Sequence, residues 1–273
     1  MASNRTLEHH TDIVIIGFGS AGACAAVEAH ECGVEVIVLE KQPEATHYSN
    51  TRMSGGGFHS PSPEGDFEAL KAYSKAMFSG ENLPHKLEGE QPEFSDELAD
   101  AWATYSPGNE AFMRGLDPLF QTVNSANAAF SEFPGAAKSG YSVVRSTYTG
   151  SSDEAILGSH SINSAKTLKQ SGEAFHTCLL TGLQSRRIPI HYETAAQSLI
   201  TDDDGAVIGV EAQRDGERVT YLARRAVIMT CGGYEYNVRM RKAFLDGPGI
   251  DGWAFYGTPA NTGDGIRMSL RIG

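Results

Sequence analysis

A glycine-rich segment, GFGSAG at residues 17–22, carries the clearest chemistry in this sequence. It follows an apolar, β-branched run and opens an alanine-rich helical stretch that begins at Ser20. Gly17 would permit the tight turn, Gly19 would let the backbone approach a ligand closely, and Gly22 would let the helix pack near the strands. Because free N–H groups and the helix dipole favour negative charge there, the segment predicts a site for the pyrophosphate of a dinucleotide.

A carboxylate stands close to the expected spacing from these glycines. Glu40 follows Gly22 by eighteen residues and ends the second predicted strand, a position from which a carboxylate binds ribose hydroxyls. It favours the unphosphorylated ribose of NAD or FAD and disfavours a 2′-phosphate. The glycines and Glu40 together do not separate NAD from FAD. A glycine turn without a ligand is the alternative, and it leaves the surrounding strand, helix and carboxylate unexplained.

The elements around the turn predict an α/β fold. Strands over Thr11–Gly17 and Val34–Leu39 flank a helix from Ser20 to about Cys32 that Gly33 ends, which makes a βαβ unit. Buried strands of this kind predict a Rossmann-like central parallel sheet with helices on both sides. Asp-Gly turns then separate three alternating strands, a three-stranded antiparallel β-meander, before a further buried strand. These four strands are predicted at Gln197–Thr201, Val207–Gln213, Arg218–Leu222 and Ala226–Thr230.

The remaining chain is read more coarsely. Helical periodicity or capping predicts helices over Asp66–Phe78, Ser95–Tyr105, Asn163–Ser185 and Asn237–Leu245. Loops are expected from Lys41 to about Pro63, and loops with short hairpins from Gln121 to Ser161.

Composition excludes several classes of protein. Acidic residues exceed basic ones by 34 to 22, a net charge of −12, which disfavours binding to nucleic acid or to an anionic membrane. No apolar run approaches the roughly 20 residues that cross a bilayer, and the first residues lack an apolar signal core. We therefore expect a cytoplasmic protein with no membrane span. The four cysteines and nine histidines show no metal-ligand spacing, so we expect reduced thiols and no metal site.

Three further motifs make the cofactor more specific. They are SNTRMSGGG at residues 49–57, the strand-rich segment from Gln197 to the double glycine at 232–233, and TPANTGDG at residues 258–265. Together they resemble the fumarate reductase/succinate dehydrogenase flavoprotein family of FAD-dependent oxidoreductases, which includes 3-ketosteroid dehydrogenases, tricarballylate dehydrogenase and urocanate reductase. The resemblance runs from about Asp12 to the last residue and is weakest between Ser79 and Ser161. It implies FAD as the cofactor.

The resemblance also implies roles for matching residues. Gly17, Gly19, Ser20, Ala21 and Gly22 would hold the pyrophosphate, Glu40 the adenosine ribose with Lys41 beside it, and Asn50 and Thr51 the phosphate and ribityl region. Ser54, Gly55 and Gly56 would lie against the isoalloxazine, and Asp264 would lie near the flavin. Ala196 would contact adenine through its backbone. Gly232 would follow the strand that returns to the cofactor. Ser49 occupies the position where succinate dehydrogenase-type members carry a histidine bonded to FAD, so noncovalent FAD is expected.

By the same resemblance, a hydride would pass between flavin N5 and a carbon next to a carboxylate or ketone of a small-molecule substrate. The electron partner is not identified. Tyr141, Arg145, Tyr148 and Tyr256 are candidates for lining the substrate pocket, and His59 for facing it. We expect residues 1–245 to form an incomplete FAD-binding domain and residues 246–273 to begin the substrate or capping region, so that the chain is a fragment whose catalytic acid or base lies beyond it.

Two alternatives stay open at this point. The first is a truncated FAD-binding protein without catalysis of its own. The second is an NAD-dependent Rossmann dehydrogenase, which the glycine turn and Glu40 would also fit.

Overall fold

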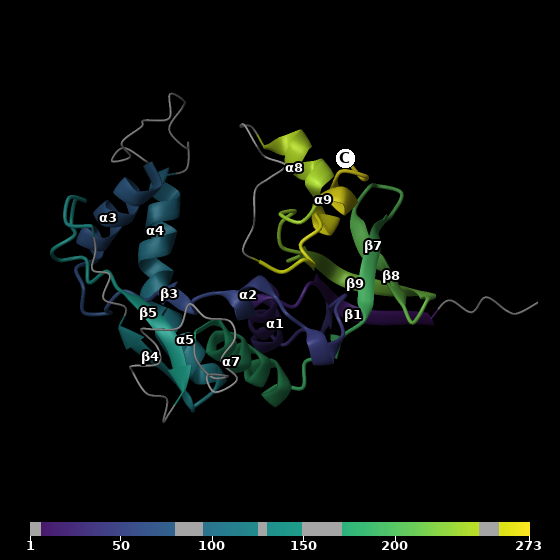
Figure 1. Cartoon of the computed structure of the whole chain (residues 1–273), viewed down its shortest axis with the longest axis horizontal. Helices are drawn as coiled ribbons and strands as arrows, with labels where there is room; N and C mark the ends of the chain where they lie inside the picture. The colour runs from purple at the N-terminus through teal and green to yellow at the C-terminus, as the bar shows by residue number, and fades with distance from the viewer. Residues whose placement is uncertain (1–6, 80–94, 125–129, 149–170, 246–256) are drawn as a thin grey trace, which may run out of the picture. The chain divides into compact units, whose positions relative to one another are not determined.

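The computed structural model describes residues 7–79, 95–124, 130–148, 171–245 and 257–273, in two compact units (Figure 1). The first unit consists of Met1–Met53 together with Leu179–Gly273, and the second is Ser54–Cys178. The predicted domain boundary after residue 245 meets residues 246–256, which lie outside the described residues, so that division stays a prediction.

A six-stranded sheet forms the centre of the first unit, in the order β6-β2-β1-β9-β8-β7. Strands β6, β2, β1 and β9 are parallel, whereas β9, β8 and β7 form an antiparallel meander. The parallel sheet with a three-stranded meander is confirmed. The strands are β1 Leu7–Ile16, β2 Val36–Leu39, β6 Ile190–His191, β7 Thr194–Thr201, β8 Val207–Arg214 and β9 Glu217–Met229.

Helix α1 (Ser20–Glu31) packs against this sheet as its sequence predicts. Its buried face consists of small residues, among them Ala23 and Ala26, which allow a close approach. The chain leaves the helix through Gly33 at φ +76°, a left-handed conformation that glycine adopts without strain. The predicted βαβ unit is therefore present.

Strand β9 differs from the prediction of two separate strands. It runs without a break from Glu217 to Met229, and its first half pairs with β8 while both halves pair with β1. The register between β1 and β9 shifts between Thr11 and Ile13 of β1. Arg224 and Arg225 form a bulge of β9 at this point and are exposed to solvent, and the strand continues beyond them. Strand β1 correspondingly begins at Leu7, four residues before the predicted start, because its first residues find partners on β9.

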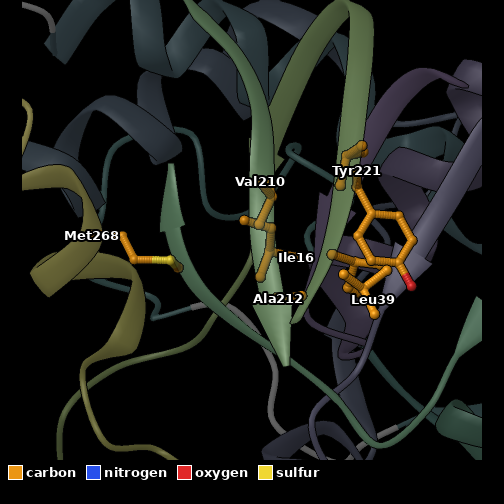
Figure 2. Close-up of a cluster of buried hydrophobic side chains, with 8 residues drawn as sticks. Ile16, Leu39, Val210, Ala212, Tyr221 and Met268 are labelled. Atoms are coloured by element: carbon orange, nitrogen blue, oxygen red, sulfur yellow. The ribbon is translucent and has the colours of Figure 1, made fainter. Parts of the chain in front are cut away.

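Both faces of the parallel strands are covered. Val14 and Ile15 point to opposite faces of β1 and neither is exposed. One face carries a hydrophobic cluster that joins β1, β2, β8 and β9 and includes Met268 of α9 (Asp264–Ser269), as Figure 2 shows. Because α9 contributes to this core, its position is fixed by packing against the sheet.

Three other helices belong wholly to the first unit. They are η1 (Glu44–Thr46), α2 (Asn50–Met53) and α8 (Val238–Phe244). The side chain of Asn237 caps α8 by accepting a hydrogen bond from the N–H of Met240. Helix α7 (Ser171–Ser185) crosses the boundary between the units, and the earlier part of the predicted helix, residues 163–170, lies outside the described residues.

The second unit is built on a separate antiparallel sheet in the order β3-β5-β4. Helices α3 and α4 match the prediction, but the sheet does not, because its strands fall where loops and short hairpins are expected. Its central strand joins two partners distant in sequence, so local patterns could not reveal the pairing. The elements are β3 Gly57–His59, β4 Phe120–Asn124, β5 Val143–Tyr148, α3 Phe67–Ser79, α4 Ser95–Tyr105, η2 Ser106–Gly108 and α5 Asn109–Leu116.

Candidate functional site

A pocket opens in the first unit beyond the carboxyl ends of β1 and β2, the usual place for ligands in open α/β sheets. Eleven of the predicted cofactor residues line it. They are Gly17, Gly19, Ser20, Ala21, Glu40, Lys41, Asn50, Thr51, Ala196, Gly232 and Asp264. These residues come from six separated stretches of the chain. The fold therefore brings together in one pocket most of the residues that the motifs selected.

The three glycines of the turn differ in whether the surrounding structure leaves room for a side chain. Gly17 has φ +106°, and a Cβ on it would lie 2.5 Å from the carbonyl oxygen of Thr230. A Cβ on Gly22 would lie 2.1 Å from the carbonyl oxygen of Gly17, although Gly22 itself does not line the pocket. The packing of strand against helix excludes any side chain at these two positions.

Gly19 is not required by the protein's own packing. Its φ of −111° suits any residue, and the nearest atom to an added Cβ is the Thr51 hydroxyl at 3.5 Å, an ordinary contact. A Cβ there would project beside a pocket that begins at the α1 N-terminus. This is the place where a pyrophosphate needs close backbone approach, so the turn fits a dinucleotide.

Helix α2 ties the pocket walls together. The N–H of Ser20 donates to the Thr51 hydroxyl at 2.8 Å, and the N–H of Thr258 donates to the Asn50 side-chain oxygen at 2.7 Å. Asn50 and Thr51 thus hold α1 and the segment before α9 in place. Their side chains still line the pocket, so this bracing is compatible with the predicted contacts to the phosphate and ribityl region.

Glu40 is buried, yet its carboxylate is well supported. One oxygen accepts the N–H of Phe18 at 2.9 Å, the other accepts the N–H of Gln42 at 2.8 Å, and the His47 ring lies 3.7 Å away. Burial alone would raise the pKa of Glu40, but the contacts with His47 and the two backbone donors outweigh it and lower the pKa. The group is therefore an anion at neutral pH. Each oxygen can accept more than one hydrogen bond, so a ribose hydroxyl still finds an acceptor.

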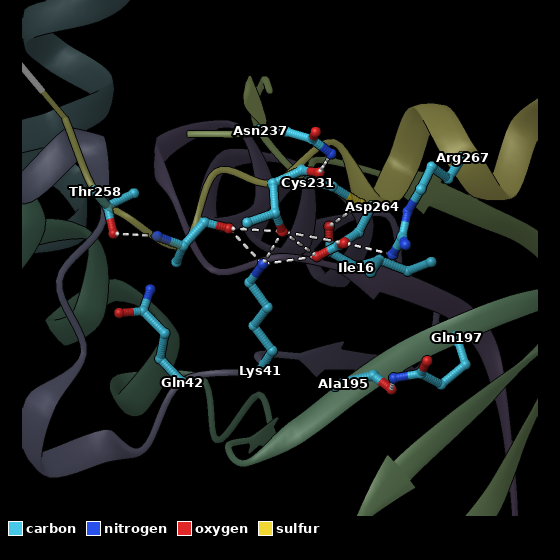
Figure 3. Close-up of polar contacts among 12 residues, drawn as sticks. Ile16, Lys41, Gln42, Ala195, Gln197, Cys231, Asn237, Thr258, Asp264 and Arg267 are labelled. Atoms are coloured by element: carbon cyan, nitrogen blue, oxygen red, sulfur yellow. Dashed lines mark hydrogen bonds and ion pairs between the residues drawn. The ribbon is translucent and has the colours of Figure 1, made fainter. Parts of the chain in front are cut away.

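Lys41 and Asp264 are partners of each other across 223 positions of sequence. The Lys41 ammonium lies 2.6 Å from the Asp264 carboxylate, and it also donates to Thr262 at 3.1 Å and to the Ala260 carbonyl (Figure 3). Burial works against the charged form of Asp264, but Lys41 prevails and lowers its pKa. The pair ties the end of β2 to the start of α9. Each residue's motif predicted a cofactor contact, and neither motif predicted this link.

The returning strand closes the pocket on its other side. Thr230, which sequence reasoning did not select, lines the pocket and donates from its hydroxyl to the carbonyls of Ile16 and Gly17, each at 2.9 Å. Burial, with a smaller contribution from Asp264, raises the pKa of Cys231 to about 11, so this thiol is neutral at pH 7. The only signal for Thr230 was its place at the end of a buried strand.

The predicted isoalloxazine contacts, Ser54, Gly55 and Gly56, belong to the second unit. Gly56 has φ +63°, and a Cβ there would lie 2.1 Å from the backbone of Ser171, so packing requires glycine. An added Cβ on Gly55 would meet nothing within 4 Å. Gly55 therefore resembles Gly19, because the protein's own packing does not explain the absence of a side chain.

The residues that the sequence suggested for the substrate pocket lie in different places. The Tyr148 hydroxyl is buried in the second unit and donates to Asp117 at 3.0 Å, so it packs in the core rather than lining a pocket. Tyr256 lies outside the described residues. Tyr141, Arg145 and His59 gather at one sheet of the second unit.

Comparison with known proteins identifies the cofactor. A family model described as "FAD binding domain" matches residues 12–273. The 3-oxosteroid 1-dehydrogenase of Mycobacterium tuberculosis is 27% identical over 312 residues, covering 96% of this chain and 54% of the relative. The digoxin reductase of Eggerthella lenta is 28% identical, covering 97% of this chain and 45% of the relative. Other relatives are named as an NADH:fumarate oxidoreductase and a cytochrome fumarate reductase. The chain thus spans about half the length of the first two relatives.

A solved structure shares the fold. The 3-ketosteroid delta1-dehydrogenase of Sterolibacterium denitrificans, in complex with 1,4-androstadiene-3,17-dione, superimposes with a TM-score of 0.74 at 22% identity, covering 97% of this chain and 55% of that one. In the part of the chain that the structure describes, no helix combines the length and apolar character needed to cross a bilayer.

Proposed function

Because the chain belongs to the family of FAD-binding domains, whose cofactor is FAD, we propose that it is the flavin-binding part of an oxidoreductase acting at a carbon next to a carboxylate or ketone. Bound FAD would supply the redox chemistry by exchanging a hydride at N5. The observation that carries the proposal is Gly19. It lines the pocket at the α1 N-terminus, and the protein's own packing does not require its missing side chain.

The chain's own residues would bind and orient the cofactor. Backbone N–H groups of Gly19, Ala21 and Gly22 would hold the pyrophosphate, with the Ser20 N–H donating to Thr51, and the Glu40 anion would accept the ribose hydroxyls. Asn50 and Thr51 would support the phosphate and ribityl region. Ala196, beside the register shift of β7, would meet adenine through its backbone, while Gly232 and Asp264 would approach from the far wall.

Gly55 would leave room for the isoalloxazine, with Ser54 and Gly56 beside it. The Ser54 hydroxyl accepts the N–H of Gly56 at 3.1 Å, which shapes this loop. Ser49 cannot form the histidine bond of covalent flavoproteins, so the flavin would be held without a covalent bond. Relatives named for steroids and fumarate suggest a ketone or an unsaturated acid as the substrate.

The test begins with the cofactor. The purified chain is saturated with FAD, desalted and examined for the visible absorbance of bound flavin. Acid precipitation should then leave the flavin in the supernatant. A chain that stays colourless with FAD but binds NAD would contradict the proposal, and flavin that stays with the precipitated protein would contradict the noncovalent part.

Turnover is tested separately. The flavin-loaded chain is assayed with an artificial electron acceptor and a saturated ketosteroid, and with a reduced dye and fumarate. Turnover of either substrate supports an oxidoreductase. A bound flavin without turnover of any ketosteroid or activated alkene would favour a protein that binds FAD without catalysis of its own.

A further inference from the structure

A buried histidine lies behind the carboxylate of Glu40. His47 stands between η1 and α2, and only 2% of the residue is exposed. Its Nε2 atom lies 3.7 Å from Oε2 of Glu40, the same oxygen that accepts the N–H of Phe18. Glu40 lines the pocket and His47 does not. His47 therefore acts on a ligand in the pocket through the residues in front of it, of which Glu40 is the charged one.

Two aromatic rings fix the imidazole of His47. Phe18, in the glycine-rich turn, stacks on it with ring centroids 5.2 Å apart, and Tyr192, between β6 and β7, meets it edge-on at 6.0 Å. Burial, with smaller contributions from Glu44 and Glu40, raises the pKa of Tyr192 to about 12, so its hydroxyl is neutral at pH 7. These rings hold the imidazole in place, and they bring no positive charge that could replace it beside Glu40.

Backbone hydrogen bonds fix the main chain of Glu40 separately. Its N–H donates to the carbonyl of His191, and its carbonyl accepts the N–H of Thr194, each at 2.9 Å. On the side chain, Oε1 accepts the N–H of Gln42 at 2.8 Å. No side-chain substitution removes these backbone donors. The contact with His47 is thus a support of the carboxylate that a single substitution can remove.

The charge of Glu40 depends on that contact. Burial raises the pKa of Glu40, and the contact with His47 is the largest of the effects that lower it. The other titratable groups nearby compensate little: burial above all raises the pKa of Cys231 to about 11, and the Lys41 ammonium lies 2.6 Å from the Asp264 carboxylate. A buried carboxylate stays ionised only where its surroundings compensate the charge, so His47 and the backbone donors share this role.

We propose that His47 is a positioning residue for the cofactor, which holds the Glu40 carboxylate in the orientation and charge state that accept the hydroxyl groups of the adenosine ribose. The inference rests on the proposed function, because it takes a dinucleotide as the ligand of the pocket. It concerns the first unit alone, to which all the contacts above belong. Loss of His47 should therefore weaken the part of the binding that comes from the ribose hydroxyls and leave the rest.

The experiment compares ADP, which is the adenosine half of FAD, with 2′,3′-dideoxy-ADP, which lacks both ribose hydroxyls. Titration calorimetry measures their affinities for the full chain without flavin. Wild type should bind ADP about 10- to 100-fold more tightly than the dideoxy nucleotide, the effect of hydrogen bonds to a charged group. His47→Leu should weaken ADP binding about 5- to 20-fold and change the affinity for the dideoxy nucleotide less than about 2-fold.

Three further variants sharpen the comparison. His47→Gln, whose amide can still donate to the carboxylate, should keep part of the preference for ADP. Glu40→Gln should reduce the preference as His47→Leu does. His9→Leu is the matched control, because His9 is a partly buried histidine of the same unit that stacks on Tyr221 at 4.8 Å and does not line the pocket. It should leave the preference for ADP unchanged.

Wild type supplies a test that needs no variant. Because the pKa of Glu40 lies below its usual value of 4.5, the preference for ADP should persist at pH 4.5 in a chain that circular dichroism shows to be folded. The ratio of the two affinities cancels the titration of the phosphates, which both nucleotides share. A preference that disappears between about pH 6 and about pH 5 would overturn the inference, even if His47→Leu fails to fold.

Two other results would also overturn it. One is an unchanged preference for ADP in a folded His47→Leu protein. The other is an equal loss of affinity for both nucleotides, which would indicate a general structural role for His47. Failure of the proposed function looks different, since neither ADP nor FAD would then bind to wild type, and the inference would fall with it.

Discussion

The two units hold their charged groups in opposite ways. In the first, the Lys41 ammonium has three acceptors, among them Asp264 at 2.6 Å, and all belong to the protein. In the second, Arg145 has no acceptor among the described residues, and the buried Thr147 hydroxyl on the same strand also lacks a partner there. The difference teaches that two cations of one chain can differ in how far the protein's own residues compensate them. Lys41 positions a wall of the pocket, whereas Arg145 makes no such link among the described residues.

Each unit contains one glycine with no room for a side chain and one glycine with room. Gly22 and Gly56 have no room for a side chain, because an added Cβ would lie 2.1 Å from backbone atoms in both cases. Gly19 and Gly55 have room. The first pair therefore reports on the packing of the protein, whereas we propose that the second pair leaves space for the cofactor.

The largest expected effect is on folding, from Gly22→Ala. A Cβ in contact with the Gly17 carbonyl would force α1 away from the sheet, and we expect a loss of more than about 3 kcal/mol in the free energy of unfolding. Urea denaturation of the apo chain measures it. Gly33→Ala is the matched control, since Gly33 has φ +76° but open space around it, and should cost only about 1 kcal/mol of backbone strain. Similar losses for the two variants would refute the packing argument.

The next effect is on cofactor binding, from Gly19→Ala. Because its backbone conformation suits alanine, the apo chain should unfold within about 1 kcal/mol of wild type. The added methyl group would nevertheless stand between the backbone and the pyrophosphate, and we expect FAD affinity to fall about 10- to 100-fold. Flavin fluorescence titration checks this. An unchanged affinity would show that the missing side chain of Gly19 does not serve the cofactor.

A smaller effect is expected from breaking the ion pair of the first unit. Lys41→Met and Asp264→Asn should each reduce the free energy of unfolding by about 1 kcal/mol, because both side chains are partly exposed to water. The double variant should lose less than the sum of the two, since the interaction can be removed only once. Additive losses in urea denaturation would mean that the two residues act independently and that the contact does not position α9.

The smallest effect concerns pH. The folded pKa of Asp264 lies below its usual value of 3.8, mainly because Lys41 overcomes the effect of burial. A depressed carboxylate pKa contributes stability that is present above about 3.8 and is lost as the pH falls through the lower, folded pKa. The stability difference between wild type and Asp264→Asn should therefore shrink below about pH 4. A difference that stays constant from neutral pH to about pH 3 would contradict it.

Local patterns predicted much of the first unit. The GFGSAG turn, the helix after it and the Asp-Gly hairpins of the meander depend on residues close in sequence, and the structure contains each of them. Strand β9 was misjudged because Arg224 and Arg225 look like the end of a strand, although a bulge accommodates them. In the second unit, the sheet β3-β5-β4 escaped prediction because its pairings join segments that carry no strong alternation of their own.

The sequence by itself predicted a dinucleotide cofactor and eleven of the residues that line one pocket of the first unit, because a dinucleotide turn is a local device whose glycines and carboxylate have fixed spacing. Only the tertiary structure decided which of those residues contact one another. Lys41 and Asp264 meet because α9 packs onto the sheet through Met268, and Arg145, which is paired with Gly57, has no acceptor among the described residues. Such relations depend on distances across the fold, which spacing along the chain does not encode.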